Sequence, residues 1–429
     1  MFDLLRQRSS CLGSALFRGP VPRQPEELEG LAEHAIAIDP RAPTDGAVWA
    51  ATLHHDAWGT AEAACLHGAP VPDRRLLELD PKLTEHDVED LAACQAAISV
   101  SLEGAQKFVP RDRKLLLRFL DALLGEDGVA AIDHTAHTIW TRPALEDELA
   151  HDADLDVESL YVVHAVSSDE DRETVIWLHT HGLAELGGFD FDILAPCPAF
   201  VNSSGEFCRA LAFSILDDRI RPGEGRCDLA HPFPPFALVP AAEFMRKAAP
   251  HYAALREDPS GEHLDNRVVL CDPVRAGRRP RPARAFGRPM PDNLVVHVPA
   301  TATALMAERA RLTYPVLRDV AAEMAEFEFP VLVKLGYEVD GGEQDEREHL
   351  WFEVHELGDE TIDATLVSSP WNIAAMRDGD RGRHAIARLS DWRVDTPVGP
   401  ITPRNAHARR LVRKHRKDLS RLVRRFRGT

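Results

Sequence analysis

Residues 174–194 read TVIWLHTHGLAELGGFDFDIL, and the rest of the chain is organised around them. The segment opens with the composition of a β-strand and ends with a second predicted strand that carries Asp190 and Asp192. Glycines at positions 182, 187 and 188 allow the chain to turn back between the two. The run LYVVHAV at 160–166 predicts one more strand, joined to the segment through the acidic turn SDEDR at 168–172. Such a short polar connection predicts an antiparallel hairpin.

The pattern outside this segment predicts an α+β fold in two units. The clearest helix is expected at 112–124, where Leu115, Leu116, Phe119, Leu120 and Leu123 form one apolar stripe. A capped helix is expected to start at Thr84. We expect a lead-in with a short helix at 1–45, an α+β domain whose mostly antiparallel sheet has helices on one face at 46–245, a Pro/Arg-rich linker at 246–305, a small β-rich domain at 306–400 and a basic helical tail at 401–429.

Composition narrows the class of protein. The 429 residues are 44% hydrophobic and 28% charged, which is typical of a soluble globular protein with two or three domains. No apolar run approaches the roughly 20 residues that span a bilayer, and the N-terminus does not resemble a secretory signal. The seven cysteines contain no C-x-x-C pair. We therefore expect a cytoplasmic protein with reduced thiols.

Charge is distributed unevenly along the chain. Positions 404–427 hold eleven Lys and Arg and one Asp, a net of +10, so the rest of the chain carries −29 of the total −19. An acidic body repels nucleic acid. We expect the tail to dock intramolecularly through Leu411, Leu419 and Leu422, because burial of each contributes about 1.5–3 kcal/mol. Contact with an anionic partner such as RNA or a membrane, and a disordered solubilising end, are the alternatives.

The stretch from Glu348 to Trp392 carries a resemblance to a known family. It contains LWFEV from Leu350, LVSSPW from Leu366, GD at Gly379 and LSDW from Leu389. Together these pieces resemble the YegJ-like family of uncharacterised bacterial domains. The region from about 46 to 240 resembles the uncharacterised domain that can precede a YegJ-like one. The resemblance implies a bacterial cytosolic protein with no established activity, and it assigns no catalytic residue.

His179 and His181 are the first candidate site. On a strand they point to the same face, about 6.6 Å apart at about 3.3 Å per residue. Two neutral imidazoles at this spacing suit a zinc ion, and Asp192 can supply an oxygen ligand. No phosphate-binding or dinucleotide motif occurs, so we expect no organic cofactor, and a divalent metal such as zinc is the one candidate.

The order of these three residues is similar to the zinc motif of JAMM-type isopeptidases, in which an H-x-H pair precedes an acid. Gly182 stands where that motif has proline, and Phe189 stands where it has serine. The upstream catalytic glutamate of that family has its nearest counterpart here in Glu158. The catalytic residues therefore stay unassigned.

A structural interpretation competes with the metal site. Val175 and Trp177 share a face with the two histidines, which can simply finish a sheet face and bond to backbone or to Asp190 or Asp192. His164 and the DHTAH run at 133–137 are further potential ligands. If the sheet brings them close to His179 and His181, a metal site is favoured over the structural interpretation.

The β-rich domain supplies a second candidate site. Trp351, Trp371 and Trp392 can line a peptide groove, as aromatic residues do in small barrels. The alternative is that they pack in the core.

We expect a non-catalytic binding or accessory protein whose partner is another protein. The alternative is a metal-dependent hydrolase centred on His179, His181 and Asp192, with a metal-bound water as nucleophile. A third hypothesis is a nucleic-acid-associated protein that acts through the tail.

Overall fold

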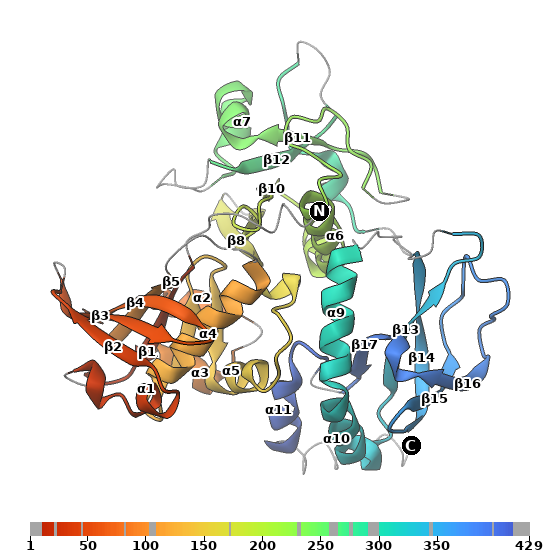
Figure 1. Cartoon of the computed structure of the whole chain (residues 1–429). Helices are drawn as coiled ribbons and strands as arrows, with labels where there is room; N and C mark the ends of the chain where they lie inside the picture. Colours follow the sequence, from red (N-terminus) through yellow and green to blue (C-terminus); the bar gives the residue numbers. More distant parts are fainter. Residues whose placement is uncertain are drawn as a thin grey trace. The chain divides into compact units, whose positions relative to one another are not determined.

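The computed structural model describes residues 11–20, 24–43, 46–80, 83–102, 109–170, 173–229, 233–256, 265–273, 278–290, 300–342, 346–396 and 399–414. It confirms the α+β class with two units (Figure 1). Unit 1 consists of Met1–Thr141 and Val157–Ala302, and unit 2 of Arg142–Asp156 and Thr303–Thr429.

Unit 1 contains a seven-stranded antiparallel sheet in the order β2-β3-β4-β5-β1-β6-β7. Its strands are β1 Leu12–Phe17, β2 Ala37–Arg41, β3 Ala47–His55, β4 Gly59–His67, β5 Ala96–Leu102, β6 Ala130–Asp133 and β7 Thr138–Thr141. Helix α4 (Val109–Leu124) packs on β1, β5 and β6. Its predicted apolar stripe is buried at Leu116, Phe119, Leu120 and Leu123. The region predicted as a lead-in therefore supplies β1, which lies inside this sheet.

A second, five-stranded sheet of unit 1 has the order β11-β12-β10-β9-β8. Its strands are β8 Val162–Glu170, β9 Glu173–His181, β10 Asp190–Leu194, β11 Ala237–Pro240 and β12 Arg267–Cys271. β8 and β9 form the predicted antiparallel hairpin. β10 is antiparallel to β9 and parallel to β12. The sequence predicted one sheet here, and the structure divides the strands between two.

Strand β12 comes from the region predicted as a Pro/Arg-rich linker. All five of its residues are buried, and it pairs with β10 on one side and β11 on the other. The apolar run VVLC at 268–271 explains this position, because such a run is typical of a strand buried on both faces. The surrounding Pro and Arg residues concealed it in the sequence pattern.

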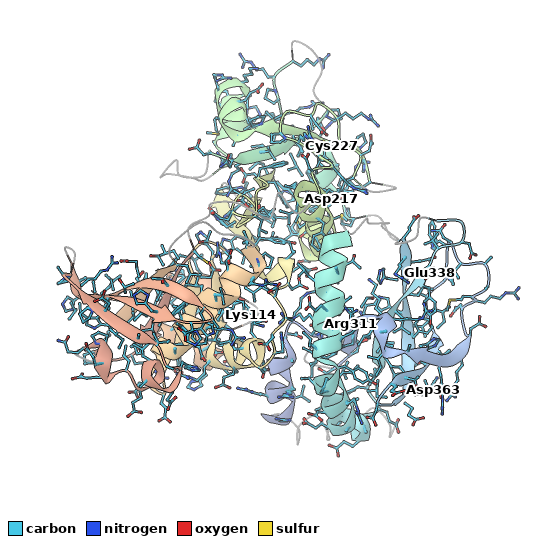
Figure 2. The ribbon with its side chains drawn as sticks, in the orientation of Figure 1. Lys114, Asp217, Cys227, Arg311, Glu338 and Asp363 are labelled. Carbon is cyan, nitrogen blue, oxygen red and sulfur yellow. The ribbon has the colours of Figure 1, made fainter. Side chains whose placement is uncertain are left out.

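Unit 2 is built on a five-stranded antiparallel sheet in the order β16-β15-β14-β13-β17. Its strands are β13 Val331–Glu338, β14 Arg347–Leu357, β15 Thr361–Leu366, β16 Arg381–Ala385 and β17 Leu389–Val394. Helices α9 (Ala300–Leu312) and α10 (Tyr314–Met324) precede it. Leu317, Val320 and Met324 of α10 share one core with Phe352 and Trp392 of the sheet. Arg311 of α9, which is labelled in Figure 2, donates to the carbonyl of Leu389 at 3.3 Å.

The segment 142–156 belongs to unit 2, although the chain on both sides of it belongs to unit 1. It contains helix α5 (Arg142–Leu149), where Glu148 binds the guanidinium of Arg309 through both oxygens. Both side chains are at most 3% exposed. Arg309 Nε also donates to the carbonyl of Pro403 at 3.1 Å, and Arg404 pairs with Asp156 at 3.1 Å. Two ion pairs thus fix this segment within unit 2.

The remaining helices complete the description of the fold. Thr84 and Asp87 form the predicted capping box of α3. Of the predicted basic tail, Arg409–Lys414 is helical, and residues 415–429 lie outside the described residues. Within the described residues, no helix is long and apolar enough to cross a membrane. The helices not yet given are α1 Glu29–Glu33, α2 Arg74–Leu79, α3 Glu85–Ala92, α6 Pro198–Leu216, α7 Ala241–Lys247, α8 Pro250–Ala253 and α11 Arg409–Lys414. Turns of 3-10 helix occur at Pro25–Glu27, Val157–Ser159, Arg284–Gly287, Ala325–Phe327, Ile386–Arg388 and Ala406–Ala408.

Candidate metal centre

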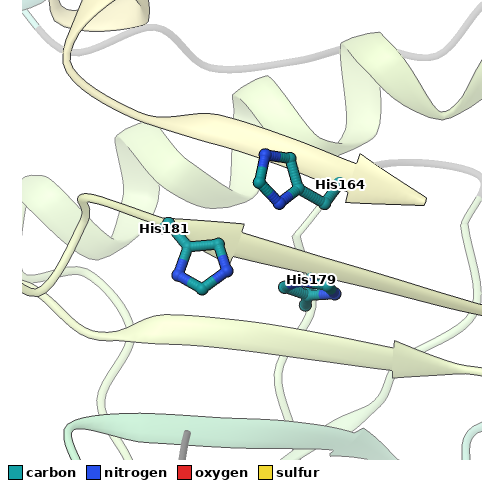
Figure 3. A group of neighbouring side chains, drawn as sticks. All are labelled: His164, His179 and His181. Atoms are coloured by element: carbon teal, nitrogen blue, oxygen red, sulfur yellow. The ribbon is translucent and has the colours of Figure 1, made fainter. Parts of the chain in front are cut away.

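The register of the β8–β9 hairpin places a third histidine beside the predicted pair. His164 of β8 lies directly opposite His179 of β9, and His181 follows two residues later on the same face. One ligand atom from each of these three imidazoles lies within 4.8 Å of the other two. Figure 3 shows the three rings gathered over the two strands. We call this group the histidine triad.

The spacing of the triad suits a single metal ion. If its three ligand atoms stood 4.8 Å apart, each would lie about 2.8 Å from their common centre. A zinc–nitrogen bond is about 2.0–2.1 Å long. Each ring therefore has to move by less than about 1 Å to bind one ion. The ring centroids of His164 and His179 are 5.4 Å apart, and that of His181 lies 5.1 and 4.9 Å from them.

A fourth histidine approaches from the other sheet of unit 1. His137 lies in the turn between β6 and β7, and its ring centroid is 4.3 Å from that of His181 and 6.0 Å from that of His164. Its backbone has a φ of 51°, in the left-handed region that non-glycine residues adopt infrequently. His137 is exposed, whereas His179 and His181 are buried and His164 is half-buried. Solvent therefore reaches the triad from the side of His137 and His164.

The surroundings favour the uncharged form of His181. The pKa of His181 lies far below its ordinary value, chiefly because burial disfavours the imidazolium and further because His137, His179, Arg267 and His164 repel it. A neutral imidazole keeps the nitrogen lone pair that a metal ion needs. His181 is therefore held in the protonation state that binds metals.

Asp192, the predicted third ligand, has a different partnership. It lies opposite His179 on β10, but its Oδ2 accepts from Arg256 Nε and its Oδ1 from Arg267 Nη1, each at 2.8 Å. Arg267 also donates to the carbonyl of Thr180 at 2.8 Å. The two arginines are at most 4% exposed and Asp192 is fully buried. Both of its oxygens are thus committed to a buried ion triplet beside the triad.

Asp190 and Glu158 bind groups outside the triad. Asp190 accepts from the backbone nitrogen of Leu183 at 3.2 Å, which holds the turn after His181. Burial raises the pKa of Asp190, and the nearby Arg267 opposes that rise. Glu158, named as the nearest counterpart of a catalytic glutamate, lies 3.5 Å from Arg209 Nη1.

The three tryptophans of unit 2 do not share one environment. Trp392 is fully buried, and its Nε1 donates to Thr313 Oγ1 at 3.0 Å. Trp351 is half-buried, with Lys334 Nζ and the Arg393 guanidinium each 5.4 Å from its ring centroid. Trp371 is 76% exposed. Trp392 therefore packs in the core, and Trp371 is the one most open to a partner.

The sequence named His164 and His137 as possible ligands but could not place them. Glu170 pairs with Glu173, so a two-residue connection joins β8 to β9, and this turn sets His164 opposite His179. The sequence pattern suggests a five-residue acidic turn instead, and a turn of that length hides this register. No local signal places His137, since it belongs to another sheet.

Comparisons with known proteins cover parts of both units. Residues 163–231, which include the triad, match the family described as "Protein of unknown function (DUF4026) C-terminal". Residues 306–401 match the family described as "Uncharacterized protein conserved in bacteria (DUF2314)". No curated protein and no solved structure matches the chain. The chain thus combines segments similar to two uncharacterised families, the second of them bacterial, and the matches carry no activity.

Proposed function

We propose that unit 1 binds one divalent transition-metal ion through His164, His179 and His181 and uses it for hydrolysis. The observation that carries the proposal is the set of three imidazole ligand atoms within 4.8 Å of one another. Imidazole nitrogens suit zinc, copper, iron and nickel. Three protein ligands with a further position open to water are typical of catalytic zinc sites, whereas structural sites are closed by four.

The exposure of the neighbouring residues supports a catalytic rather than a structural ion. His137 is exposed and His164 is half-buried, so a substrate can approach from their side. A bound ion would supply a Lewis acid and lower the pKa of a coordinated water. The chain itself would hold the ion with neutral imidazoles and exclude Asp192 through Arg256 and Arg267. On this proposal Asp192 positions the strand that faces His179 and is not a ligand.

Metal content tests the proposal directly. Protein purified without chelator or nickel affinity should contain about one equivalent of metal by mass spectrometry. The double variant His179→Gln/His181→Gln should contain almost none. His54→Gln, at an exposed histidine on β3, is the matched control and should keep the metal.

Two further measurements keep the test decisive. If the double variant is unstable, His164→Gln at the half-buried position should weaken binding by at least about 100-fold, which is about 2.7 kcal/mol. Cobalt titration of metal-free wild-type protein should give the absorption of nitrogen-coordinated cobalt. A folded wild-type protein that neither retains metal nor changes its spectrum with cobalt would refute the proposal.

Hydrolysis is tested separately from binding. Zinc-loaded wild-type protein should cleave nitrophenyl esters or phosphoesters, and His164→Gln should lose this activity at equal protein concentration. A metal-loaded protein without activity on esters, phosphoesters and amides would leave a metal-binding unit and contradict the hydrolase.

A second function, non-catalytic binding of another protein, is favoured by Trp371 in unit 2. The backbone nitrogens of Trp371 and Asn372 donate to the carboxylate of Glu348, each at 2.8 Å, and that of Ala374 donates to Asp340 at 2.7 Å. The loop thus holds a tryptophan that is 76% exposed. A large aromatic residue on a preorganised backbone is typical of interface hot spots.

Quantitative affinity purification with wild-type protein and Trp371→Ala tests this second function. A partner that depends on Trp371 should be recovered and should bind the purified protein at least about 30-fold more weakly after the substitution. An identical set of recovered proteins with both baits would count against it.

A further inference from the structure

Unit 2 has an open groove with a volume of about 610 Å³ beside helix α10. It is bounded by α10, the turn that follows it, and strands β13 and β14. Its lining is mainly apolar and includes four polar or charged residues. The apolar residues are Pro315, Ala321, Ala322, Met324, Ala325, Phe329, Val331, Val354 and Leu357, and the others are Arg318, Asp319, His355 and Glu356.

The described chain ends close to this groove. Arg413 of α11 binds the carboxylate of Glu323 on α10, with Nε 2.8 Å from Oε2. That hydrogen bond raises the pKa of Arg413, and the charge of Asp319 adds to the rise more weakly. Asp319 lines the groove and lies one helical turn before Glu323. Arg413, one residue before the end of the described chain, therefore lies about one helical turn from the groove.

The sequence of the remaining 15 residues, HRKDLSRLVRRFRGT, is amphipathic. Leu419, Leu422, Val423 and Phe426 follow the i, i+3, i+4, i+7 spacing of one helix face. The other positions include six Lys and Arg and one Asp. As a helix these residues would span about 22 Å, enough to lie along a groove next to α10.

The charges around the groove complement this segment. Asp319 and Glu356 are part of the lining, and Glu326 and Glu328 flank Ala325 and Phe329 in the chain. The guanidinium of Arg318 donates to Asp359 at 2.6 Å, which offsets the positive charge nearest the groove. A basic segment with an apolar face is therefore the occupant that fits.

We propose that residues 415–429 bind this groove within the same chain, with Leu419, Leu422 and Phe426 against its apolar lining residues. Because the tail is joined to the same chain, it can occupy the groove even when the affinity of the groove for it is low. A tethered segment has an effective concentration of about 1 mM, so a groove with a dissociation constant of about 100 µM is about 90% occupied.

Peptide binding to the truncated chain tests the proposal. A protein that ends at Lys414 should bind a fluorescent peptide of residues 415–429 with a saturable rise in anisotropy. Full-length protein should bind it at least 10-fold more weakly, because its own tail fills the groove. A peptide of the same composition with its apolar positions scrambled should not bind either protein.

A pair of matched variants locates the binding surface. Ala322→Arg places bulk and positive charge in the groove and should weaken peptide binding to the truncated protein at least 10-fold. Ala304→Arg, at an exposed position of α9, should leave it unchanged. Two results would overturn the proposal: equal binding by truncated and full-length proteins, and tail-dependent dimers in which a second copy fills the groove.

Discussion

Asp192 was expected to bind a metal ion, but its carboxylate takes part in a buried ion triplet with Arg256 and Arg267. We expect Asp192→Asn to lower the free energy of unfolding by about 3–5 kcal/mol, because the substitution removes the carboxylate charge that the buried Arg256 and Arg267 bind. The folded fraction should keep its metal. Urea denaturation and the metal content of the folded protein measure the two effects. Loss of metal from a stable Asp192→Asn protein would instead restore Asp192 as a ligand.

An exposed ion pair supplies the control for that substitution. Asp363 of β15 is bound by Arg381 of β16 at 2.9 Å, and the Arg381 side chain is 58% exposed. Solvent screens such a pair, so Asp363→Asn should shift the urea midpoint far less than Asp192→Asn does.

His349 gives unit 2 a stability that depends on pH. Its Nδ1 is 2.8 Å from Ser390 Oγ, and burial, with Lys334 and Arg347 nearby, lowers its pKa to about 4. Between about pH 6.5 and pH 4 the unfolded chain binds a proton that the folded chain does not. Stability should therefore fall as the pH drops through this window, by up to about 3 kcal/mol from this residue.

Urea midpoints at pH 7.5 and pH 4.5 check this prediction. His349→Gln should lose less stability across the window than the wild type, while other titrating groups affect both proteins equally. An identical loss in the two proteins would show that His349 is protonated in the fold.

At the scale of elements, the turn after β9 decides where the triad stands. Gly182 has a φ of 108°, and a Cβ there would lie 2.3 Å from the carbonyl oxygen of Leu160. We expect Gly182→Ala to cost at least about 2 kcal/mol, through backbone strain and displacement of the chain next to His181. Metal affinity should fall with it, which calorimetric zinc titration measures.

Gly205 is the matched glycine in helix α6. Apart from its chain neighbours and the backbone of its own helix, no atom of the described residues lies within 4 Å of the position that its Cβ would take. Gly205→Ala should raise the free energy of unfolding by about 0.5–1 kcal/mol, because alanine loses less entropy in a helix. Thermal melts of the two variants should therefore shift in opposite directions.

At the scale of the whole molecule, unit 2 is not contiguous in sequence. Arg309 is 2% exposed and is bound by Glu148, which comes from the segment 142–156. A chain of residues 300–429 alone would bury this arginine without its partner, at a cost of about 3–5 kcal/mol. Since domains are stable by about 5–15 kcal/mol, we expect it to be marginal or unfolded.

Circular dichroism melts of three proteins test the discontinuity. Residues 300–429 alone should melt early or not at all, and fusion of residues 142–156 through a Gly/Ser linker should restore a cooperative transition. Glu148→Gln in the fused protein should abolish that gain. A cooperative transition of residues 300–429 at the same temperature as the fused protein would contradict the prediction.

Local sequence patterns predicted the α+β class, the antiparallel hairpin of β8 and β9, helix α4 and the capping box of α3. These features depend on periodicity and capping within a few residues, which a linear pattern contains. The sequence also singled out His179 and His181, because two residues of spacing on a strand already place both on one face.

The surroundings of that pair depend on contacts between residues far apart in the chain. His164 joins it through a strand register, and His137 reaches it from a different sheet. Both oxygens of Asp192 are bound by Arg256 and Arg267, which lie 64 and 75 positions further along the chain. Strands β1 and β12 were assigned to a lead-in and a linker because local composition does not reveal the pairing that buries them. Contacts between residues far apart in the chain arise from the packing of whole elements, and no local periodicity encodes them.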